Sequence, residues 1–297
     1  GFNQALCMNN SNELNQLIEL MNKLLTQDAF HHINQNELHH LSFQLSANGK
    51  HRIVVYTMRS DAHLRRLKPV LSEFAEKNGI SLFHGHLKTA GQSVDYLFPE
   101  LIFGEVDIIY RSGGKDYTAL PAVWTPVAHG SERPLINVMK SWFNDHGHGK
   151  LLELGCGNGV ITLQLTDRFH RVTGVEINRW AVKSAEQNPE RLGITNAVFR
   201  TGEATHAVKK LVTAGESFDS VIIHGMRKPF GEKLFGLLNA LKVTTISLIS
   251  PAVSSWLKDC RYLLDAGWRL TDVVMVDQLP HTSGYLFLGC LRKEVNR

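Results

Sequence analysis

The chain has 297 residues, of which 43% are hydrophobic and 20% charged, so it is an ordinary soluble globular protein with room for one large or two modest domains. Its net charge of +4 is compatible with nucleic-acid binding without requiring it. Because no apolar run approaches about 18 residues and the four cysteines form no C-x-x-C pair, we expect a cytoplasmic protein without a membrane segment, a bound metal or a disulfide framework.

The first part of the chain predicts a helix followed by a small α+β domain. Ser11 can cap a helix whose apolar residues recur every three or four positions as far as Leu25, so we assign residues 1–27 to an N-terminal helix. Residues 28–117 form the small domain, in which Asn48-Gly49 favours a hairpin turn. Its expected elements are strands 41–47 and 52–58, helix 62–78, and strands 81–86, 101–103 and 106–111.

Basic and histidine residues in this region allow two interpretations. Side chains on and near the helix 62–78 could contact RNA phosphates, although such charges commonly form a solvated face. These basic residues are Arg59, Arg65, Arg66 and Lys68. The histidines form adjacent pairs, which chelate poorly, and no carboxylate or cysteine cluster accompanies them, so we predict no metal site. The histidines are His31, His32, His39 and His40.

Residues 118–297 alternate strands and helices in the pattern of a mostly parallel sheet. After a connector with three prolines and helix 135–143, the expected elements are strand 151–154, helix 161–169, strand 172–175, helix 179–187, strand 197–200, helix 205–212, strand 220–224, helix 232–241, strand 245–250, helix 254–266, and strands 270–276 and 285–291. Because no helix separates the last two strands, one strand runs antiparallel. The predicted fold class is α/β, a seven-stranded Rossmann-like domain preceded by a small α+β domain.

The stretch 150–176 carries the strongest chemical signal. Gly155, Gly157 and Gly159 follow an apolar strand with the spacing G-x-G-x-G, and without Cβ atoms the backbone can turn sharply and let a ligand approach its N–H groups. About seventeen residues later Glu176 ends the next strand, where a carboxylate can accept hydrogen bonds from ribose hydroxyls. This pattern is typical of an adenosine-type cofactor lying across the carboxyl ends of parallel strands. A glycine turn without a ligand is the alternative.

The spacing distinguishes between adenosine cofactors. A dinucleotide fingerprint needs a third glycine at position 160, which is Val160, so an NAD-type oxidoreductase is disfavoured. The stretch resembles motif I of S-adenosyl-L-methionine (SAM) methyltransferases, which commonly begins with an acid, as Glu153 does here. The resemblance implies SAM as the cofactor and adenine recognition after the third strand of the domain. The predicted cofactor-binding residues are Glu153, Gly155, Cys156, Gly157, Asn158, Gly159, Glu176, Ile177 and Glu203.

The order of the motifs resembles the RNA uracil-5-methyltransferases, which act on transfer and ribosomal RNA. The likeness extends from residue 41 to the C-terminus and includes an α+β domain before the methyltransferase domain. Segment 275–282 is similar to that family's D-x-x-P-H-T motif, and RYLLDAG at 261–267 is similar to its helix end. The resemblance implies a SAM-dependent methyltransferase with RNA (tRNA or rRNA) as its partner.

The catalytic residues of that family are missing at the matching positions. Since carbon 5 of uracil is not nucleophilic, a cysteine thiolate first adds to carbon 6, and a glutamate later removes the carbon-5 proton. Here the cysteine position falls on Pro251 and the glutamate position on Leu286. The D-P-P-R motif reads His224-Gly-Met-Arg227, and the glutamine that contacts SAM falls near Thr125. We therefore expect the uracil-5 mechanism to be absent.

The remaining cysteines and polar residues leave several interpretations open. Cys156, Cys260 and Cys290 could replace the nucleophile, although burial as small apolar groups is the common fate of such cysteines. His224 could act as a base, since methylating an oxygen or a ring nitrogen needs alignment and sometimes one base, or it could fill the place of the lost aspartate. Arg227 could hold a phosphate or a carboxylate, or pair with a structural acid.

These residues predict a SAM-dependent methyltransferase that acts on RNA without the covalent cysteine mechanism, with His224 and Arg227 as catalytic candidates. The alternative is a non-catalytic SAM- or RNA-binding protein that keeps the fold. The sequence names neither the acceptor atom nor the oligomeric state.

Overall fold

The structure is a computed structural model. It describes residues 11–26, 38–58, 62–88, 97–125, 132–143, 149–225, 228–277 and 284–293. For residues 62–67 it describes the backbone only. The chain divides into two compact units, Gly1–Tyr110 with Thr118–Val123 and Arg111–Tyr117 with Trp124–Arg297. Each unit is described by itself below.

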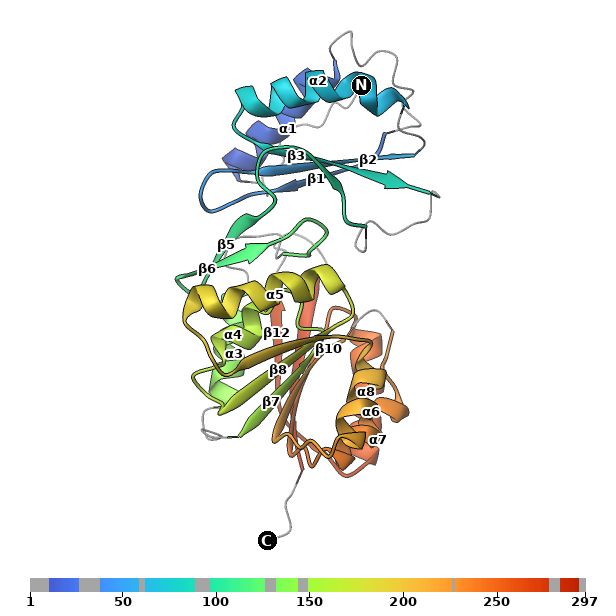
Figure 1. Cartoon of the computed structure of the whole chain (residues 1–297). Coiled ribbons are helices and arrows are strands. Elements are labelled where there is room, and N and C mark those ends of the chain that lie inside the picture. The colour runs from blue at the N-terminus through green and yellow to red at the C-terminus, as the bar shows by residue number, and fades with distance from the viewer. Residues whose placement is uncertain are drawn as a thin grey trace. The chain divides into compact units, whose positions relative to one another are not determined.

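The first unit is a four-stranded sheet with two helices. Its elements are α1 (Asn12–Leu25), β1 (Leu38–Gln44), β2 (Arg52–Met58), α2 (Ala62–Lys77), β3 (Ser81–Leu87) and β4 (Glu100–Phe103). The strand order is β1-β2-β3-β4, with β2 and β3 parallel and the two outer pairings antiparallel. Both helices cover the same face of the sheet (Figure 1). The expected α+β architecture is therefore present.

Helix α1 is part of this unit's core. The Ser11 hydroxyl accepts a hydrogen bond from the Leu14 N–H at 3.2 Å and caps the helix, as its sequence predicts. Leu17 and Met21 are buried and pack in one cluster with Ile53 of β2 and Leu71 of α2. The helix expected over residues 1–27 thus shares its hydrophobic core with the small domain that follows it.

A two-stranded hairpin, β5 (Ile108–Ser112) and β6 (Lys115–Ala119), follows the first sheet. The sequence analysis expected a strand at 106–111 but no partner for it. Gly113 and Gly114, with φ values of 56° and 77°, supply the left-handed turn that the hairpin needs. This glycine pair was the available signal for β6.

The second unit contains α3 (Arg133–Trp142), β7 (Lys150–Leu154), α4 (Val160–Gln164), β8 (Arg171–Glu176), α5 (Arg179–Leu192), β9 (Ala197–Thr201), α6 (Ala204–Thr213), β10 (Ser220–His224), α7 (Glu232–Ala240), β11 (Thr245–Ser250), α8 (Val253–Asp265), β12 (Arg269–Asp277) and β13 (Tyr285–Arg292). The strand order is β12-β13-β11-β10-β7-β8-β9. The pairings from β11 to β9 are parallel, and β13 runs antiparallel to both of its neighbours. This confirms the predicted seven-stranded Rossmann-like fold.

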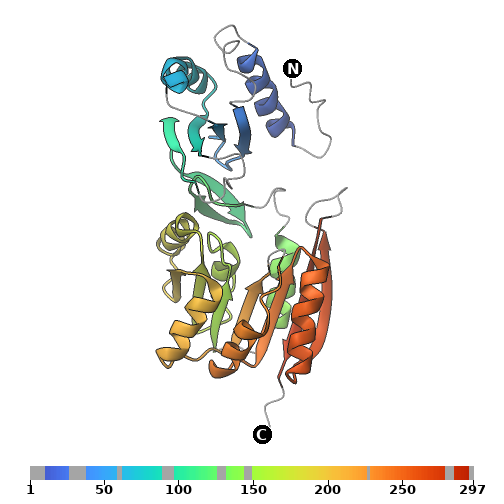
Figure 2. The same cartoon turned by 90° about the vertical axis from the view of Figure 1, so that its right-hand side faces the viewer.

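Helices cover both faces of this sheet, which is why its strands are nearly continuous apolar runs. Figures 1 and 2 show α6, α7 and α8 on one face and α3, α4 and α5 on the other. The core on the first face includes Leu234 of α7 and Trp256 of α8, and the core on the second includes Met139 of α3. None of the described helices is both long and apolar enough to cross a membrane.

Helix α4 is shorter than the sequence predicts. We expected a helix over 161–169, but it ends at Gln164. The Asn196 side chain donates hydrogen bonds to the carbonyl oxygens of Thr166, at 3.0 Å, and Phe169, at 2.9 Å. The Asn196 side chain, just before β9, holds the chain after Gln164. Residues 165–169 therefore form a turn in place of the helix that the sequence predicts.

Candidate functional site

The sheet order brings the main predicted residues to one edge. Strand β7 lies between β8 and β10. The chain after β7 crosses by α4 to β8, whereas the chain after β10 crosses by α7 to β11 in the opposite direction, so the carboxyl ends of β7 and β10 flank a topological switch point. Ligands of open α/β sheets bind in the crevice at such a point. The turn that starts at Gly155 follows β7, Glu176 ends β8 and His224 ends β10. We therefore locate the candidate site at this edge.

The glycine turn has the sharp, left-handed backbone for which glycine is suited. Gly155, Gly157 and Gly159 have φ values of 81°, 55° and 80°. Its start is fixed to β8, because the N–H groups of Gly155 and Cys156 donate to the Val175 carbonyl at 2.8 and 3.1 Å. A side chain at these positions would be strained, because L-residues other than glycine rarely adopt positive φ.

The three glycines differ in their surroundings. A Cβ on Gly159 would lie 2.7 Å from Cζ of Phe199, and a Cβ on Gly155 would lie 3.1 Å from Cβ of His224. A Cβ on Gly157 would meet nothing within 4 Å. Gly159 and Gly155 therefore permit close packing, whereas Gly157 borders open space that a ligand can approach.

Glu176 holds the turn while keeping capacity for a ligand. One carboxylate oxygen accepts from the Gly157 N–H at 3.1 Å, and the other accepts from the Asn178 N–H at 2.8 Å. A carboxylate offers about four acceptor positions, so two remain for ribose hydroxyls. Ile177, the next residue, is 54% exposed, so its side chain is accessible to the face of an adenine ring. These features fit the adenosine part of SAM.

Asn158 and Cys156 are buried inside the turn. The Asn158 carbonyl accepts from the Asn188 side-chain amide at 3.2 Å, and its own Nδ2 has no hydrogen-bond partner among the described residues. The Cys156 side chain fills the space beside Gly174, where a Cβ would lie 2.7 Å from its sulfur. Both were predicted to bind cofactor. The Cys156 side chain packs behind the turn, and the Asn158 carbonyl ties the turn to α5.

Glu203 has a structural contact that the sequence analysis did not anticipate. It was predicted to take part in adenine recognition, but its carboxylate caps α6 by accepting from the N–H groups of Thr205, at 3.0 Å, and His206, at 2.8 Å. Partial burial raises the Glu203 pKa, but these hydrogen bonds outweigh it and hold the pKa below its ordinary value. Glu203 thus fixes the helix start beside the site.

Glu153 lies beneath the site and pairs with His224. Its carboxylate is fully buried and accepts hydrogen bonds from the Thr162 hydroxyl and from Nε2 of His224, the latter at 2.7 Å. The His224 side chain keeps 24% of its surface exposed. The sequence analysis assigned Glu153 to the cofactor and did not identify Thr162. A threonine in the first turn of the helix after the glycines was the available signal.

The positions at which the uracil-5 family has its catalytic groups are occupied as follows. Pro251 is exposed just after β11, and Leu286 lies in β13 against the core that contains Leu135. Thr125 is half-buried. Arg227 lies outside the described residues.

The three described cysteines are buried, and burial raises the pKa of each thiol. The pKa of Cys260 rises to about 12, helped by the nearby Asp259 carboxylate, and those of Cys156 and Cys290 also rise. Because the thiolate is the reactive form, we expect all three to resist iodoacetamide at about pH 8 in the folded protein and to react in urea. Peptide mass spectrometry would check this. Native alkylation of Cys156 would show that a thiol reaches the site.

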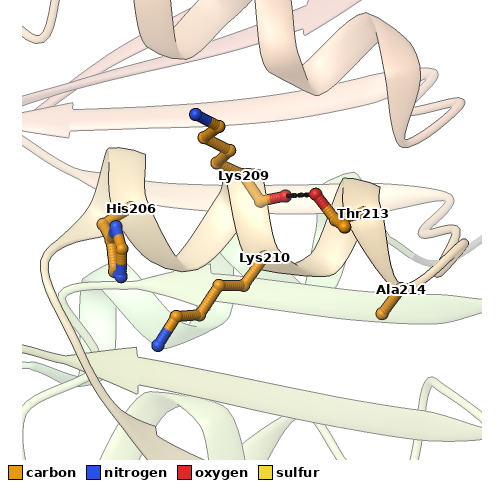
Figure 3. A pocket seen from close by; sticks show the side chains of 5 residues that line it. All are labelled: His206, Lys209, Lys210, Thr213 and Ala214. Carbon is orange, nitrogen blue, oxygen red and sulfur yellow. Dashed lines mark hydrogen bonds between the residues drawn. The ribbon is translucent and has the colours of Figure 1, made fainter.

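Histidines and basic residues among the described residues also lie on β1 and α6. Among the described residues, no group of three or more histidine, cysteine or acidic side chains could hold a metal ion. His39 and His40 are exposed on β1, whereas His31 and His32 lie outside the described residues. A shallow hollow on α6 is lined by His206, Lys209, Lys210, Thr213 and Ala214 (Figure 3). Four of the five residues belong to α6, Ala214 caps its C-terminal end, and none belongs to the glycine turn, so this hollow is a surface depression separate from that turn.

Comparisons with known proteins agree with this architecture. Residues 145–264 match a family model described as "Methyltransferase domain". An uncharacterised RNA methyltransferase of Geobacter sulfurreducens is 28% identical, over 62% of this chain and 37% of that protein. The 23S rRNA (uracil(1939)-C(5))-methyltransferase of Aeromonas salmonicida is 27% identical, over 84% of this chain and 54% of that protein. The chain thus spans about a third to a half of the length of these relatives.

A solved structure extends the likeness to nearly the whole fold. The Pyrococcus abyssi tRNA (uracil-54, C5)-methyltransferase, solved with S-adenosyl-L-homocysteine, matches with a TM-score of 0.73 at 17% identity. The match covers 93% of this chain and 66% of that one. The chain is therefore similar to RNA methyltransferases, and residues 145–264 match a methyltransferase domain, a domain whose cofactor is SAM.

Proposed function

We propose that this protein methylates RNA with SAM and that it does so without a covalent cysteine intermediate. The observation that carries the proposal is the convergence of the glycine turn, Glu176 and His224 at the switch point, with no described thiol in the open part of the site. RNA as the acceptor is supported by the homologous RNA methyltransferases.

The chain's own residues provide the cofactor site in this proposal. The backbone at Gly157 borders the open space, Glu176 binds the ribose hydroxyls and Ile177 packs against the adenine. When bound, SAM supplies an activated methyl group on a sulfonium, so the protein's task is to align the acceptor and to remove its proton. The buried side chains of Glu153 and Cys156, and the Asn158 carbonyl that accepts from Asn188, hold this surface in place.

The absence of the uracil-5 chemistry is supported by the residues at the family's catalytic positions. Pro251 has no nucleophilic atom, and Leu286 packs in the core and cannot accept a proton. The raised pKa values of Cys156 and Cys260 oppose thiolate formation at these alternative positions. The same substitutions favour a second candidate, a SAM- or RNA-binding protein without methyl transfer.

One experiment separates these two candidates. Purified protein is incubated with methyl-labelled SAM and total cellular RNA, and calorimetry measures SAM binding in parallel. Label in RNA that is absent when the protein is omitted, and that needs a higher SAM concentration with a Glu176→Ala variant, supports the enzyme. SAM binding without labelled RNA supports the binding protein, and a lack of SAM binding would overturn both.

The basic residues on and near α2 of the first unit are our candidates for RNA contact. Lys68 is exposed and pairs with Glu100 at 3.3 Å, while the side chains of Arg59, Arg65 and Arg66 lie outside the described residues. We expect RNA affinity to fall with rising salt through counterion release, and removal of all four charges to reduce the slope by roughly one unit for each lost phosphate contact.

Filter binding between about 50 and 300 mM salt measures this slope. A Lys209→Ala, Lys210→Ala variant removes two charges from the α6 hollow in the other unit and serves as the control. If the fourfold variant leaves the slope unchanged, those residues are ordinary surface. If the α6 variant reduces it, RNA contacts that helix instead.

A further inference from the structure

Three side chains beneath the switch point form a connected hydrogen-bonded group. The Thr162 hydroxyl and Nε2 of His224 approach different oxygens of the Glu153 carboxylate, the latter at 2.7 Å. Glu153 and Thr162 are fully buried, and they come from β7 and α4. His224 joins them from the end of β10. The sheet order, which places β10 next to β7, brings these residues together although Glu153 and His224 are 71 positions apart.

The chemistry of this group determines which ring nitrogen carries the proton. A buried carboxylate is costly unless hydrogen bonds satisfy it, and an ionised one can only accept them. Because Glu153 accepts from Thr162 with one oxygen, the other oxygen requires a donor, and Nε2 of His224 is that donor. Nε2 therefore carries a hydrogen, and in the neutral ring Nδ1 is an acceptor.

The other ring nitrogen is available. Nδ1 of His224 has no hydrogen-bond partner among the described residues, and it is not fully buried. The side chain is 24% exposed, and its Cβ lies 3.1 Å from where a Cβ of Gly155 would be. The ring thus lies beside the first glycine of the cofactor turn, and the Glu153 carboxylate fixes the position of its Nε2.

We infer that Glu153 is a positioning residue which holds His224 so that Nδ1 accepts a proton from the methyl acceptor, and that this acceptor is an N–H or O–H group of RNA. The inference rests on the function proposed above. In the transfer, a lone pair of the acceptor atom forms the bond to the methyl carbon, the sulfonium sulfur leaves with its bonding electrons, and the acceptor's proton passes to Nδ1. The Glu153 carboxylate then stabilises the imidazolium.

This arrangement matches acceptors that lose a proton from nitrogen or oxygen. An exocyclic amine, a ring N–H or a ribose hydroxyl has both a lone pair and a proton to release, so a single base and good alignment suffice. Carbon 5 of uracil needs a nucleophile on carbon 6 first, and a histidine held by a buried carboxylate does not replace that nucleophile. The arrangement of Glu153, Thr162 and His224 therefore favours a nitrogen or an oxygen as the atom that receives the methyl group.

The tautomer can be measured without any turnover. Nitrogen-15 correlation spectra of the histidine rings distinguish protonated from unprotonated nitrogens, and the signal lost in a His224→Gln variant identifies this residue. We expect Nε2 protonated and Nδ1 unprotonated at about pH 8. The opposite tautomer would overturn the inference. An Asp259→Asn variant, which changes another buried carboxylate of the same unit, is the control and should leave the His224 signal in place.

The role in methyl transfer is tested with Glu153→Gln, which keeps the shape and removes the charge. We expect its rate of methyl transfer at saturating RNA and SAM to fall about a hundred-fold, with its SAM affinity within about threefold of wild type, because the loss falls on proton transfer. Equal rates in variant and wild type would overturn the inference. If Glu153→Gln does not fold, His224→Gln replaces it, since its ring is partly exposed, and the same outcomes apply.

A failure of the proposed function is distinguishable from a failure of this inference. If the wild type binds SAM but labels no RNA, the proposed enzyme activity is wrong and the inference falls with it, even when the expected tautomer is found. If the wild type labels RNA while Glu153→Gln and His224→Gln label it equally well, the activity stands and only the inference is wrong.

Discussion

Replacing Arg52 by methionine is expected to destabilise the first unit by about 3–5 kcal/mol, the largest effect on stability that we predict. Arg52 is fully buried in β2. Its guanidinium donates to the Gln44 side chain and to the carbonyl oxygens of Val106, Ala119 and Leu120, the three carbonyls lying at 3.1, 3.2 and 3.1 Å. Methionine fills a similar volume but leaves these buried acceptors without donors.

The charge of Arg52 is also costly to bury, which shows how much its hydrogen bonds must offset. Burial lowers the pKa of its guanidinium to about 9, against the opposing influence of the Asp107 carboxylate. At neutral pH the group remains charged and bonded. These contacts also explain why Thr118–Val123 belongs to the first unit, since the carbonyls of Ala119 and Leu120 are fixed to β2.

Urea unfolding, with hydrogen exchange at β2 amides as the probe for this unit, measures the effect. A Lys50→Met variant is the control, because Lys50 pairs with Glu105 while both side chains are more than half exposed, and exposed pairs contribute about 0–1 kcal/mol. An unfolding midpoint for Arg52→Met equal to that of the control would show that the buried network contributes little.

The second large effect is expected for cofactor binding. Glu176→Ala should weaken SAM binding by about 1.5–3 kcal/mol, or roughly 10- to 150-fold, because it removes a charged acceptor from the ribose hydroxyls. It also removes the hydrogen bonds that hold the N–H groups of Gly157 and Asn178. The turn and the start of α5 therefore lose part of their support.

Calorimetry with SAM measures this change. Glu186→Ala removes an exposed acid from α5 and is the matched control, with affinity expected to stay at the wild-type value. A Glu176→Gln variant separates the two contributions, since its amide oxygen can still accept one backbone N–H while the charge is lost. Wild-type affinity in Glu176→Ala would place the ribose elsewhere.

The order of elements in the second unit could be predicted because each has a strong local signal. Strands β10 and β11 are short apolar runs bounded by polar residues, and their bounds match the expected ones. The turn after β7 could be predicted because glycine adopts its three positive φ values far more readily than other residues do. Periodicity and glycine spacing depend on neighbours in the chain, so they are visible in a sequence.

The contacts that define the site depend on residues far apart in the chain, so the sequence did not indicate them. Nothing near Glu153 indicates that His224 will satisfy its carboxylate, and its predicted cofactor role rests on the resemblance to motif I. Glu203 was assigned to adenine because of its place after β9, although its carboxylate caps α6. The burial of Arg52 was missed because two of its acceptors lie 67 and 68 residues away.

The central claim is that this chain transfers a methyl group from SAM to RNA without a covalent cysteine adduct. The most direct test is incubation with methyl-labelled SAM and RNA that contains 5-fluorouridine, followed by digestion to nucleosides and mass spectrometry. We predict labelled nucleosides other than 5-methyluridine, and no protein–RNA adduct that survives denaturation. A SAM-dependent adduct mapped to Cys156, Cys260 or Cys290, or label in 5-methyluridine, would contradict this account.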